Sequence, residues 1–391
     1  MVTISKILAR PILDSRGEWT IEATLLLSSG ALITASVPQG KSTGTYEAKT
    51  VSPKKAVWNI EHIILPRLKG KDPRNQRVID ELLMSLDKTP GKSRIGGNTM
   101  LAVSIAAARA GGIAKKIPLW KHIRSVSGLR GPFKTPRLYI NVINGGLHAG
   151  NNLIFQEYLV IPRAKNISDA VRMGTALYQR IGEDLAKKKG KGATNVGDEG
   201  GYASNFTNAF EPFSIIRKVA TSLGFASKID LGLDAAASKI NRPAHSLKIL
   251  YQNMKSKFGL FYLEDPFKEN DWKNFSALCK KTKQKPSITG DDLTVTNIRR
   301  MEEAKKKCAV NAVIIKPNQI GTVSEAIDAV RFARRAGWLV VASHRSGETN
   351  DDFIADFAYG VGADGLKLGA PARGERIAKY NRLLEIEIRE E

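Results

Sequence analysis

The sequence lacks most of the features that place a protein outside the cell or in a membrane. Its 391 residues include two cysteines, Cys279 and Cys308, whose spacing fits neither a disulfide framework nor a metal site. No run of 18 or more apolar residues occurs, so we expect no transmembrane helix. Arg10, Asp14 and Arg16 follow the short apolar stretch at the N-terminus, so we expect no signal peptide. These absences favour a cytoplasmic protein without a membrane partner.

Acidic residues are scarce relative to basic ones. The chain has 38 Asp and Glu against 61 Lys and Arg, a net charge of +23. Such an excess is typical of proteins that bind nucleic acid or anionic surfaces. Aromatic residues make up 7% of the chain and do not alternate with the lysine runs, so a stacking platform for single strands is not indicated. Two interpretations stay open, a solvated basic surface, which we favour, and a nucleic-acid partner.

The first third of the chain predicts three strands followed by helices. The strand-like segments are 3–8, 20–27 and 31–37, and the helical ones are 54–68, 75–86 and 98–116. Glycine and proline then cluster at 126–136, which indicates a domain boundary. We expect an α+β capping domain over residues 1–126 and a second domain over 136–391.

The second part alternates short apolar runs with helical stretches. Eight runs occur, at 139–143, 158–161, 229–233, 259–263, 287–289, 312–315, 339–342 and 365–368. Eight strands, most of them separated by helices, are typical of a βα barrel. The predicted fold class is therefore α/β, an N-terminal α+β domain followed by a barrel. Active sites of such barrels lie at the carboxyl ends of the strands.

Acidic residues stand at the ends of three apolar runs. Asp234, Glu264 and Asp291 each follow a predicted strand. Carboxylates that converge on one barrel mouth repel one another unless a cation lies among them, and hard oxygen ligands suit Mg²⁺. A single acid in this position would more often cap a helix or form an ion pair. Three at different strands favour a metal site.

Basic residues end other runs. Lys316 follows Ala-Val-Ile-Ile, Lys367 follows Gly-Leu, and His344 and Arg345 follow Val-Val-Ala-Ser. Burying an unpaired lysine is costly, so these positions need a partner or a function. A lysine close to other cations and a metal can be neutral near pH 7 and act as a base. The alternative is an ion pair with a neighbouring acid.

Three more candidates lie in or beside loops. Glu199 precedes a glycine pair, His148 lies within Gly-Gly-Leu-His-Ala-Gly, and Glu157 follows Phe-Gln. Glycine gives a loop the backbone freedom to position an acid. A lone histidine is more often structural, but one near a charged barrel mouth is a candidate for the site.

Together these motifs resemble the enolase family, in the same order along nearly the whole chain. They lie at 12–17, 92–98, 145–150, 156–157, 196–201, 263–266, 291–297, 316–322, 343–349 and 367–373. The resemblance implies a Mg²⁺-dependent lyase, phosphopyruvate hydratase, that reversibly dehydrates 2-phospho-D-glycerate to phosphoenolpyruvate in glycolysis and gluconeogenesis. It also implies a homodimer.

The resemblance further implies a role for each candidate. The expected ligands of Mg²⁺ are Asp234, Glu264 and Asp291. The expected catalytic residues are Lys316 as the base and Glu199, supported by Glu157, as the acid that helps hydroxide leave. The expected substrate contacts are His148, Glu157, His344, Arg345, Ser346 and Lys367. Of these, Arg345 and Ser346 would hold the phosphate, and Lys367 would hold the carboxylate and lower the pKa of the base.

The chain departs from the family pattern at a loop that usually reads Ser-Gly-Ala-Ser-Thr-Gly. Here Gln39 and Lys41 replace the first serine and the alanine, and both changes favour a weaker second Mg²⁺ site. Two alternatives stay open. One is an enolase-like paralogue acting on another carboxylate. The other is a basic protein that keeps the fold but binds nucleic acid or an anionic surface, which the net charge favours and the intact set of candidate catalytic residues disfavours.

Overall fold

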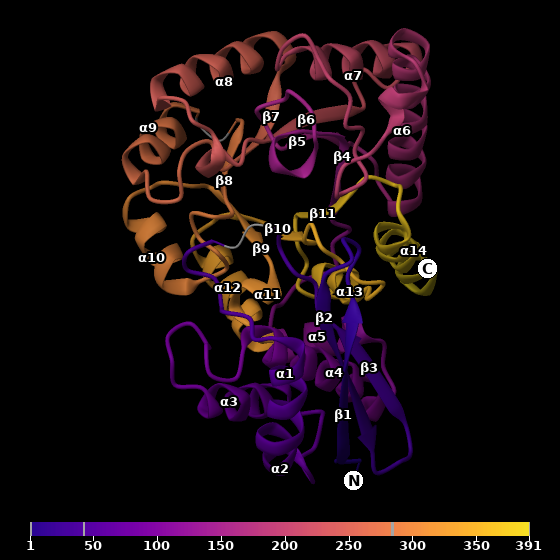
Figure 1. The fold of residues 1–391 in the computed structure, drawn as a ribbon, viewed down its shortest axis with the longest axis vertical. Helices are drawn as coiled ribbons and strands as arrows, with labels where there is room; N and C mark the ends of the chain where they lie inside the picture. Colours follow the sequence, from indigo (N-terminus) through magenta and orange to yellow (C-terminus); the bar gives the residue numbers. More distant parts are fainter. Residues whose placement is uncertain (1, 42–43, 283–284, 391) are drawn as a thin grey trace.

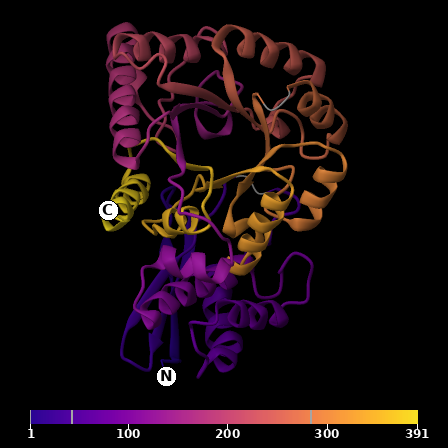
Figure 2. The ribbon, with the colours of Figure 1, turned by 180° about the vertical axis from the view of Figure 1, so that it is seen from behind.

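A computed structural model describes residues 2–41, 44–282 and 285–390. It consists of a small sheet-and-helix unit beside a closed barrel ringed by helices (Figure 1). From behind, the helices still surround the barrel and the N-terminal unit stays at one end (Figure 2). No helix of the described residues is long and apolar enough to cross a membrane.

The N-terminal unit is an antiparallel sheet covered by helices. Its strands pair in the order β1 (Ile4–Leu13), β2 (Trp19–Leu27) and β3 (Leu32–Ser36). Alternate residues of β2 are fully buried, as expected for a sheet with one covered face. The helices are α1 (Pro53–Asn59), a π-helical turn (Ile60–Ile64), α2 (Leu65–Leu68), α3 (Gln76–Leu86), α4 (Gly97–Lys115) and α5 (Leu119–Ser127). The predicted strands and helices of this part are confirmed.

The barrel closes in the order β10-β11-β4-β5-β6-β7-β8-β9. Its strands are β4 (Arg137–Asn144), β5 (Glu157–Pro162), β6 (Ile229–Asp234), β7 (Leu260–Glu264), β8 (Ser287–Gly290), β9 (Ala312–Ile315), β10 (Leu339–Ser343) and β11 (Gly365–Gly369). All eight predicted runs are barrel strands. One strand, β5, runs antiparallel to both neighbours, while the other pairs are parallel. The amino end of β5 therefore lies at the same mouth as the carboxyl ends of the others.

Helices cover the outside of the barrel. The long ones are α6 (Ile167–Lys189), α7 (Glu211–Ser222), α8 (Ala244–Phe258), α9 (Trp272–Thr282), α10 (Ile298–Lys306), α12 (Val323–Arg335), α13 (Phe353–Gly360) and α14 (Gly374–Glu390). Short helical turns are η2 (Gly146–His148), η3 (Lys191–Thr194), η4 (Ala237–Lys239) and α11 (Pro317–Ile320). A buried layer that includes Tyr139, Tyr262 and Ile314 fills the interior, so the barrel is a packed core.

The N-terminal unit reaches the barrel through the segment that follows β3. The Ser36 hydroxyl lies 2.8 Å from that of Thr349, and the Ala48 N–H donates to the Gln319 carbonyl at 2.8 Å. Arg109 of α4 forms ion pairs with Asp351 and Asp352 beyond β10. These contacts hold the segment after β3 over the barrel mouth.

Candidate active site

One polar pocket lies at the carboxyl ends of the barrel strands. Ten of its lining residues were predicted from the sequence. They are His148, Glu157, Glu199, Asp234, Asp291, Lys316, His344, Arg345, Ser346 and Lys367. Of these, Glu157 lies at the amino end of β5. Glu264 lies just beneath the lining, in contact with Lys367. The structure therefore brings the predicted site residues into one place.

Lys367 stands at the centre of three carboxylates. Its Nζ lies 2.9 Å from oxygens of Glu157, Asp234 and Glu264, which come from β5, β6 and β7. Burial disfavours the ammonium, but Asp234 and the other two carboxylates raise the pKa of Lys367 well above its usual value. Lys367 is therefore a fixed positive charge at the barrel mouth.

Two predicted metal ligands are held by further hydrogen bonds. Asp234 accepts from the Gln156 side chain at 3.1 Å and from the Ala236 N–H at 3.0 Å. Glu264 accepts from the Tyr262 hydroxyl at 2.6 Å. Burial, followed by the charge of Asp234, raises the pKa of Glu264 to about 8. Such a buried carboxyl gains from additional positive charge nearby.

Lys316 pairs with the third predicted ligand. Its Nζ donates to Asp291, which also accepts from Gln319 at 2.9 Å. Burial disfavours the ammonium of Lys316, but the charge of Asp291 raises its pKa above the usual value. Lys367 lowers the pKa of Lys316, as expected, and so does Arg345. The net shift is nevertheless upward, because the attraction of the Asp291 carboxylate outweighs the repulsion from Arg345 and Lys367.

Two acids beside Asp291 enlarge the acidic cluster. Asp265, Asp291 and Asp292 each place a carboxylate oxygen within 4.8 Å of the others. Asp265 accepts from the N–H groups of Asp291 and Asp292 at 3.1 and 2.7 Å. Burial, followed by the charge of Asp291, raises the pKa of Asp292 to about 7. This concentration of buried oxygen ligands fits a hard divalent cation.

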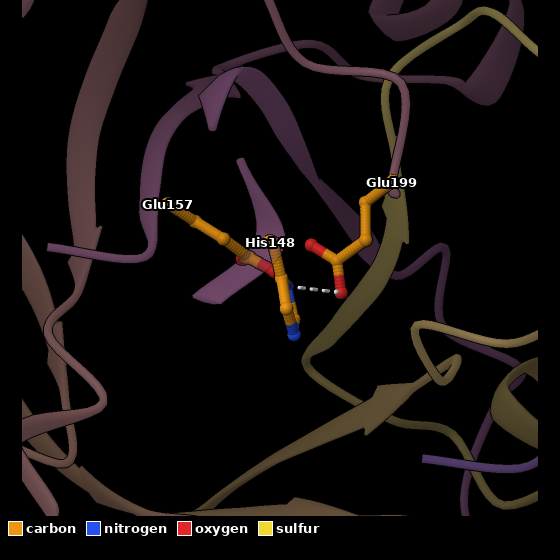
Figure 3. Close-up of side chains that lie close together, drawn as sticks. All are labelled: His148, Glu157 and Glu199. Carbon is orange, nitrogen blue, oxygen red and sulfur yellow. Dashed lines mark ion pairs between the residues drawn. The ribbon is translucent and has the colours of Figure 1, made fainter. Parts of the chain in front are cut away.

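A second compact group contains His148, Glu157 and Glu199, whose side chains point toward one another (Figure 3). His148 Nδ1 lies 3.3 Å from Glu199 Oε1, and Asn141 donates to Glu199 Oε2 at 3.1 Å. Burial and the charge of Glu199 raise the pKa of Glu157 well above its usual value. Burial opposes the charge on Glu199, but His148 and Glu157 lower its pKa. Burial and charge thus favour the protonated form of Glu157 and the ionised form of Glu199.

His344 is fixed in one tautomer by an arginine. Arg376 Nη1 lies 2.6 Å from His344 Nδ1. Arginine only donates, so Nδ1 accepts and the ring proton is on Nε2, which faces Glu199 Oε1 at 3.7 Å. Burial and the charge of Arg376 lower the pKa of His344 well below its usual value. His344 is therefore a neutral donor directed at the acid pair.

Arg345 and Ser346 lie where the N-terminal unit meets the barrel. Arg345 donates to Glu47 at 2.8 Å and to Asn318 at 2.9 Å. Burial disfavours its charge, but Glu47 raises its pKa. The Ser346 hydroxyl accepts from the Lys41 N–H at 2.7 Å. An arginine and a hydroxyl on one wall of the pocket suit an anionic oxygen group.

The segment with the unusual Gln39 and Lys41 crosses the pocket. The N–H and carbonyl of Gln39 pair with Gly347 at 2.8 and 2.9 Å. The Lys41 ammonium lies 2.9 Å from Asp198, the residue before Glu199. Lys41 thus faces an acid. Ser42 and Thr43 of the same loop lie outside the described residues.

Sequence reasoning missed several residues of the pocket and of its immediate surroundings. Asp265 and Asp292 directly follow predicted ligands, so the doubled acids were a usable signal. Glu47 and Arg376 come from a loop of the N-terminal unit and from α14, far from any apolar strand end. No local pattern marks them, because their roles depend on tertiary contacts with Arg345 and His344.

Two protein-family models match the chain. The model described as "Enolase, N-terminal domain" matches residues 4–123. The model described as "Enolase, C-terminal TIM barrel domain" matches residues 133–245 and 241–390. Between them they account for both the sheet-and-helix unit and the barrel.

Several known proteins are similar over nearly the full length. "Enolase 2" of Hevea brasiliensis is 42% identical, and the alignment covers 99% of this chain and 95% of the relative. "Enolase" of Solanum lycopersicum is 41% identical with the same coverage of both chains. "Enolase" of Mastigamoeba balamuthi is 40% identical and covers 99% of this chain and 96% of the relative.

Proposed function

The chain belongs to the enolase family, and from this premise we propose how the residues of its pocket carry out the reaction. The protein is a lyase, a phosphopyruvate hydratase, that reversibly dehydrates 2-phospho-D-glycerate to phosphoenolpyruvate. The reaction removes a proton from the carbon next to a carboxylate and releases hydroxide from the neighbouring carbon. The observation that supports the division of roles best is the separation of a buried lysine–aspartate pair from a buried pair of glutamates whose pKa values are shifted in opposite directions.

Lys316 is proposed as the base that takes the α-proton. In the structure its Nζ donates to Asp291, and this carboxylate keeps the pKa of the lysine high. Lys367 and Arg345 act in the opposite direction, because their positive charges lower the pKa of Lys316. Any positive charge that shares the Asp291 carboxylate weakens the pairing and makes the neutral amine easier to reach.

A divalent cation, proposed to be Mg²⁺, fits Asp234, Glu264 and Asp291. Asp234 and Glu264 both approach Lys367 Nζ within 3.0 Å, and Asp291 contributes to the raised pKa of Glu264, so the three carboxylates act on one region. When bound, such a cation would supply positive charge that favours loss of the α-proton. Enolase-superfamily sites are themselves a standard example of a Lys or His base combined with Mg²⁺.

Glu199 and Glu157 are proposed as the acid that assists the leaving hydroxide. The opposite pKa shifts of the two carboxyls favour a proton on Glu157 beside an ionised Glu199, and such a pair could supply a proton to the leaving hydroxide. His148 and the neutral His344 contact Glu199 from two sides at 3.3 and 3.7 Å and hold it in place. Proton removal and proton donation are thereby assigned to different walls of the pocket.

The remaining cations are proposed to hold the substrate. Arg345 and Ser346 would bind the phosphate, since a guanidinium and a hydroxyl suit phosphate oxygens. Lys367 would face the substrate's carboxylate as a fixed ammonium. His148 and His344 would contact the substrate as well as Glu199. In this arrangement the anionic groups of the substrate meet positive charge, and the reacting carbons lie between Lys316 and Glu199.

The family also supports proposals for the molecule as a whole. We propose two domains, residues 1–126 and 136–391, with the segment between α5 and β4 as the link. We propose a homodimer in the cytoplasm. The β1–β2 hairpin exposes the paired side chains of Leu13 and Trp19, 55% and 60% accessible, which supports a protein contact at this hairpin.

An assay of the purified protein tests the proposed function. The full-length chain is incubated with 2-phospho-D-glycerate, and phosphoenolpyruvate is followed with Mg²⁺, with a chelator, and with Mg²⁺ restored. We expect product with Mg²⁺, loss of the activity in the chelator and recovery on restoring the metal. Activity that is unchanged in the chelator would contradict the metal proposal. The absence of product under all conditions would contradict the function.

A further inference from the structure

Two stretches of the chain contain no acidic residue. One lies between Asp234 and Glu264 and the other between Asp271 and Asp291. They include all of α8 and α9, and each of these helices carries three lysines and no opposing charge. None of the lysines of α8 and α9 lines the pocket proposed for the dehydration reaction. The stretches therefore account for part of the +23 charge in one region of the molecule.

The lysines of this region gather at one end of the barrel. The helices α8, α9 and α10 follow one another along one side of the molecule (Figure 1). They lead into β7, β8 and β9, which are adjacent and parallel, so the carboxyl ends of the three helices lie at the same end. Six lysines occupy these helix ends and are called the basic rim: Lys255, Lys257, Lys280, Lys281, Lys305 and Lys306.

The basic rim lies opposite the pocket. The pocket is built at the carboxyl ends of the strands, where Glu264 ends β7 and Lys316 follows β9. The rim lies beside the amino ends of the same strands. A ligand on the rim therefore does not need to enter the pocket, and the two sites can be tested separately.

All six side chains of the rim are exposed. Within the part of the chain that the structure describes, none of the six forms an ion pair with an acid, whereas the neighbouring Lys307 pairs with Glu303 at 3.7 Å. One lysine in the last turn is enough to stabilise a helix through its dipole, but each of these three helices has two lysines there. Glu302 and Glu303 of α10 are the acids of these three helices, so positive charge exceeds negative charge at the helix ends.

We propose that the basic rim binds the phosphate backbone of a nucleic-acid duplex. Neighbouring helices lie about 8–10 Å apart, so three helix ends span roughly 20–30 Å with the width of the helices included. A duplex presents one negative charge per about 1.7 Å over that length. The rim supplies charge without a pattern of base-reading side chains, so binding is independent of sequence.

The surroundings of the rim favour a duplex over other anionic partners. Within the described residues of α8, α9 and α10, Ile249 is the one large apolar side chain classed as exposed. A membrane-binding surface needs several apolar side chains to insert into the lipid. Single strands need aromatic side chains on which bases stack, and the aromatic residues of these helices are buried or half-buried.

The test compares two variants with the same change in net charge. In the rim variant all six rim lysines become glutamine. In the control variant six exposed lysines of the N-terminal unit, which have no ion pair in the described structure, become glutamine: Lys6, Lys54, Lys55, Lys69, Lys71 and Lys88. The probe is a fluorescent DNA duplex of about 20 base pairs, roughly 70 Å long at 3.4 Å per base pair.

We expect the parent to bind the duplex at about 50 mM salt and to lose most of the binding by about 200 mM. The rim variant should bind at least tenfold more weakly, and its slope of log K against log salt should be smaller by up to about 5, at about 0.9 per lost phosphate contact. The control variant should bind within about threefold of the parent. Both variants should keep the parent's dehydration activity.

Three results would overturn the proposal. The first is that the parent does not bind the duplex at low salt. The second is that the rim and control variants bind the duplex equally weakly. The third is that the parent binds phosphatidylserine-containing vesicles but not the duplex. Equal weakening would mean that net charge alone attracts nucleic acid. Loss of dehydration activity in the rim variant would contradict the separation of the two sites, and circular dichroism of that variant distinguishes this from unfolding.

Discussion

Two buried lysines at the pocket carry the same charge in different surroundings. Lys367 has three carboxylates within 2.9 Å, whereas Lys316 donates to Asp291 alone among the described acids. Removing the proton from Lys367 would leave three carboxylates without their shared cation. Removing it from Lys316 affects one carboxylate, which a metal can compensate. This difference is why Lys316 suits the role of base and Lys367 that of a fixed charge.

The first prediction concerns the Asp291 carboxylate. Asp291→Asn replaces an anionic ligand with a neutral one, so we expect Mg²⁺ to bind at least about tenfold more weakly, since loss of even an outer partner of a metal site costs about that much. Titration calorimetry measures the affinity. Asp169→Asn on the exposed surface of α6 serves as the control. Equal affinities in the two variants would rule out Asp291 as a ligand.

The second prediction concerns stability in acid. His122 is fully buried between α4 and α5, and neither ring nitrogen has a hydrogen-bond partner in the described structure. Burial lowers the pKa of His122 to about 4, below its usual 6.5. The unfolded chain therefore takes up the proton first as the pH falls. The contribution of neutral His122 to the free energy of unfolding is therefore fully present above about pH 6.5. It is lost as the pH falls from about 6.5 to about 4.

Protonation of His122 in the unfolded chain lowers the free energy of unfolding by up to about 3 kcal/mol, at about 1.4 kcal/mol per pKa unit. We expect His122→Met to reduce the fall in unfolding free energy between pH 7 and pH 4.5 by roughly this amount. Urea titrations at the two pH values measure it. His245→Met changes an exposed histidine and should leave the fall as in the parent. A fall that is the same in His122→Met and the parent would contradict the account.

Sequence reasoning located site residues that end a strand. Asp234, Glu264 and Lys316 were found because an apolar run precedes each one and barrel sites lie at such ends. It could not find Glu47 or Arg376, whose partners are far away along the chain. It expected Lys367 to lower the pKa of Lys316, and it does, but the larger effect of the pairing with Asp291 depends on tertiary structure.

At the scale of elements, one reversed strand positions the acid pair. Glu157 pairs with Asn144 at the end of β4 and with Asp234 at the end of β6. In a parallel strand the first residue would lie at the opposite end of the barrel. The antiparallel direction of β5 brings Glu157 to the pocket, where it contacts Lys367 and lies close to Glu199.

The third prediction concerns the loop after β3. The ion pair between Lys41 and Asp198 joins this loop to the segment that carries Glu199. We expect Lys41→Ala and Asp198→Asn each to raise the KM for 2-phospho-D-glycerate about two- to fivefold, because a partly exposed ion pair contributes up to about 1 kcal/mol. The effects should not add in the double variant, since both remove one contact.

Steady-state kinetics at low and high salt measure the effect of the loop pair. The difference in KM between the parent and Lys41→Ala should be smaller at high salt, because salt screens an exposed ion pair. Arg180→Ala breaks a more exposed ion pair on α6, far from the loop in sequence, and should leave KM as in the parent. Fully additive single-variant effects would show that Lys41 and Asp198 act independently.

The sequence predicted where the barrel strands lie along the chain, but it did not predict the direction of every strand. Each apolar run predicted a barrel strand, because burial on both faces demands continuous apolar residues. The reversal of β5 was not predicted. Only the residues from Gly145 to Gln156 join β4 and β5, with no long helix among them, and a parallel pair needs a longer crossover. That short connection was the available signal.

At the scale of the whole molecule, charge is distributed by function. The pocket balances buried acids with Lys316, Lys367 and Arg345, whereas the six lysines of the basic rim form no ion pair within the described residues. The net charge alone did not distinguish a dispersed surface from a localised one. The topology does, because consecutive helices of a barrel deliver their carboxyl ends to one end of the molecule.

The fourth prediction concerns assembly. We expect a molar mass twice the 42.8 kDa of the chain by light scattering. The double change Leu13→Ser with Trp19→Ser removes the paired apolar side chains that the β1–β2 hairpin exposes, and it should shift the protein toward the monomer. Trp58→Ser, at a 53% exposed position on α1, is the control and should not change the mass. A dimer that survives the hairpin variant would place the contact elsewhere.

The most direct test of the mechanism follows the substrate's α-proton. The protein is incubated with 2-phospho-D-glycerate in deuterated water with Mg²⁺, and exchange at the α-carbon is followed by nuclear magnetic resonance. We expect exchange by the parent and none above background by Lys316→Ala, while calorimetry shows Mg²⁺ binding that is not weakened, because Asp291 stays intact. Undiminished exchange in Lys316→Ala would contradict the claim that this lysine removes the proton.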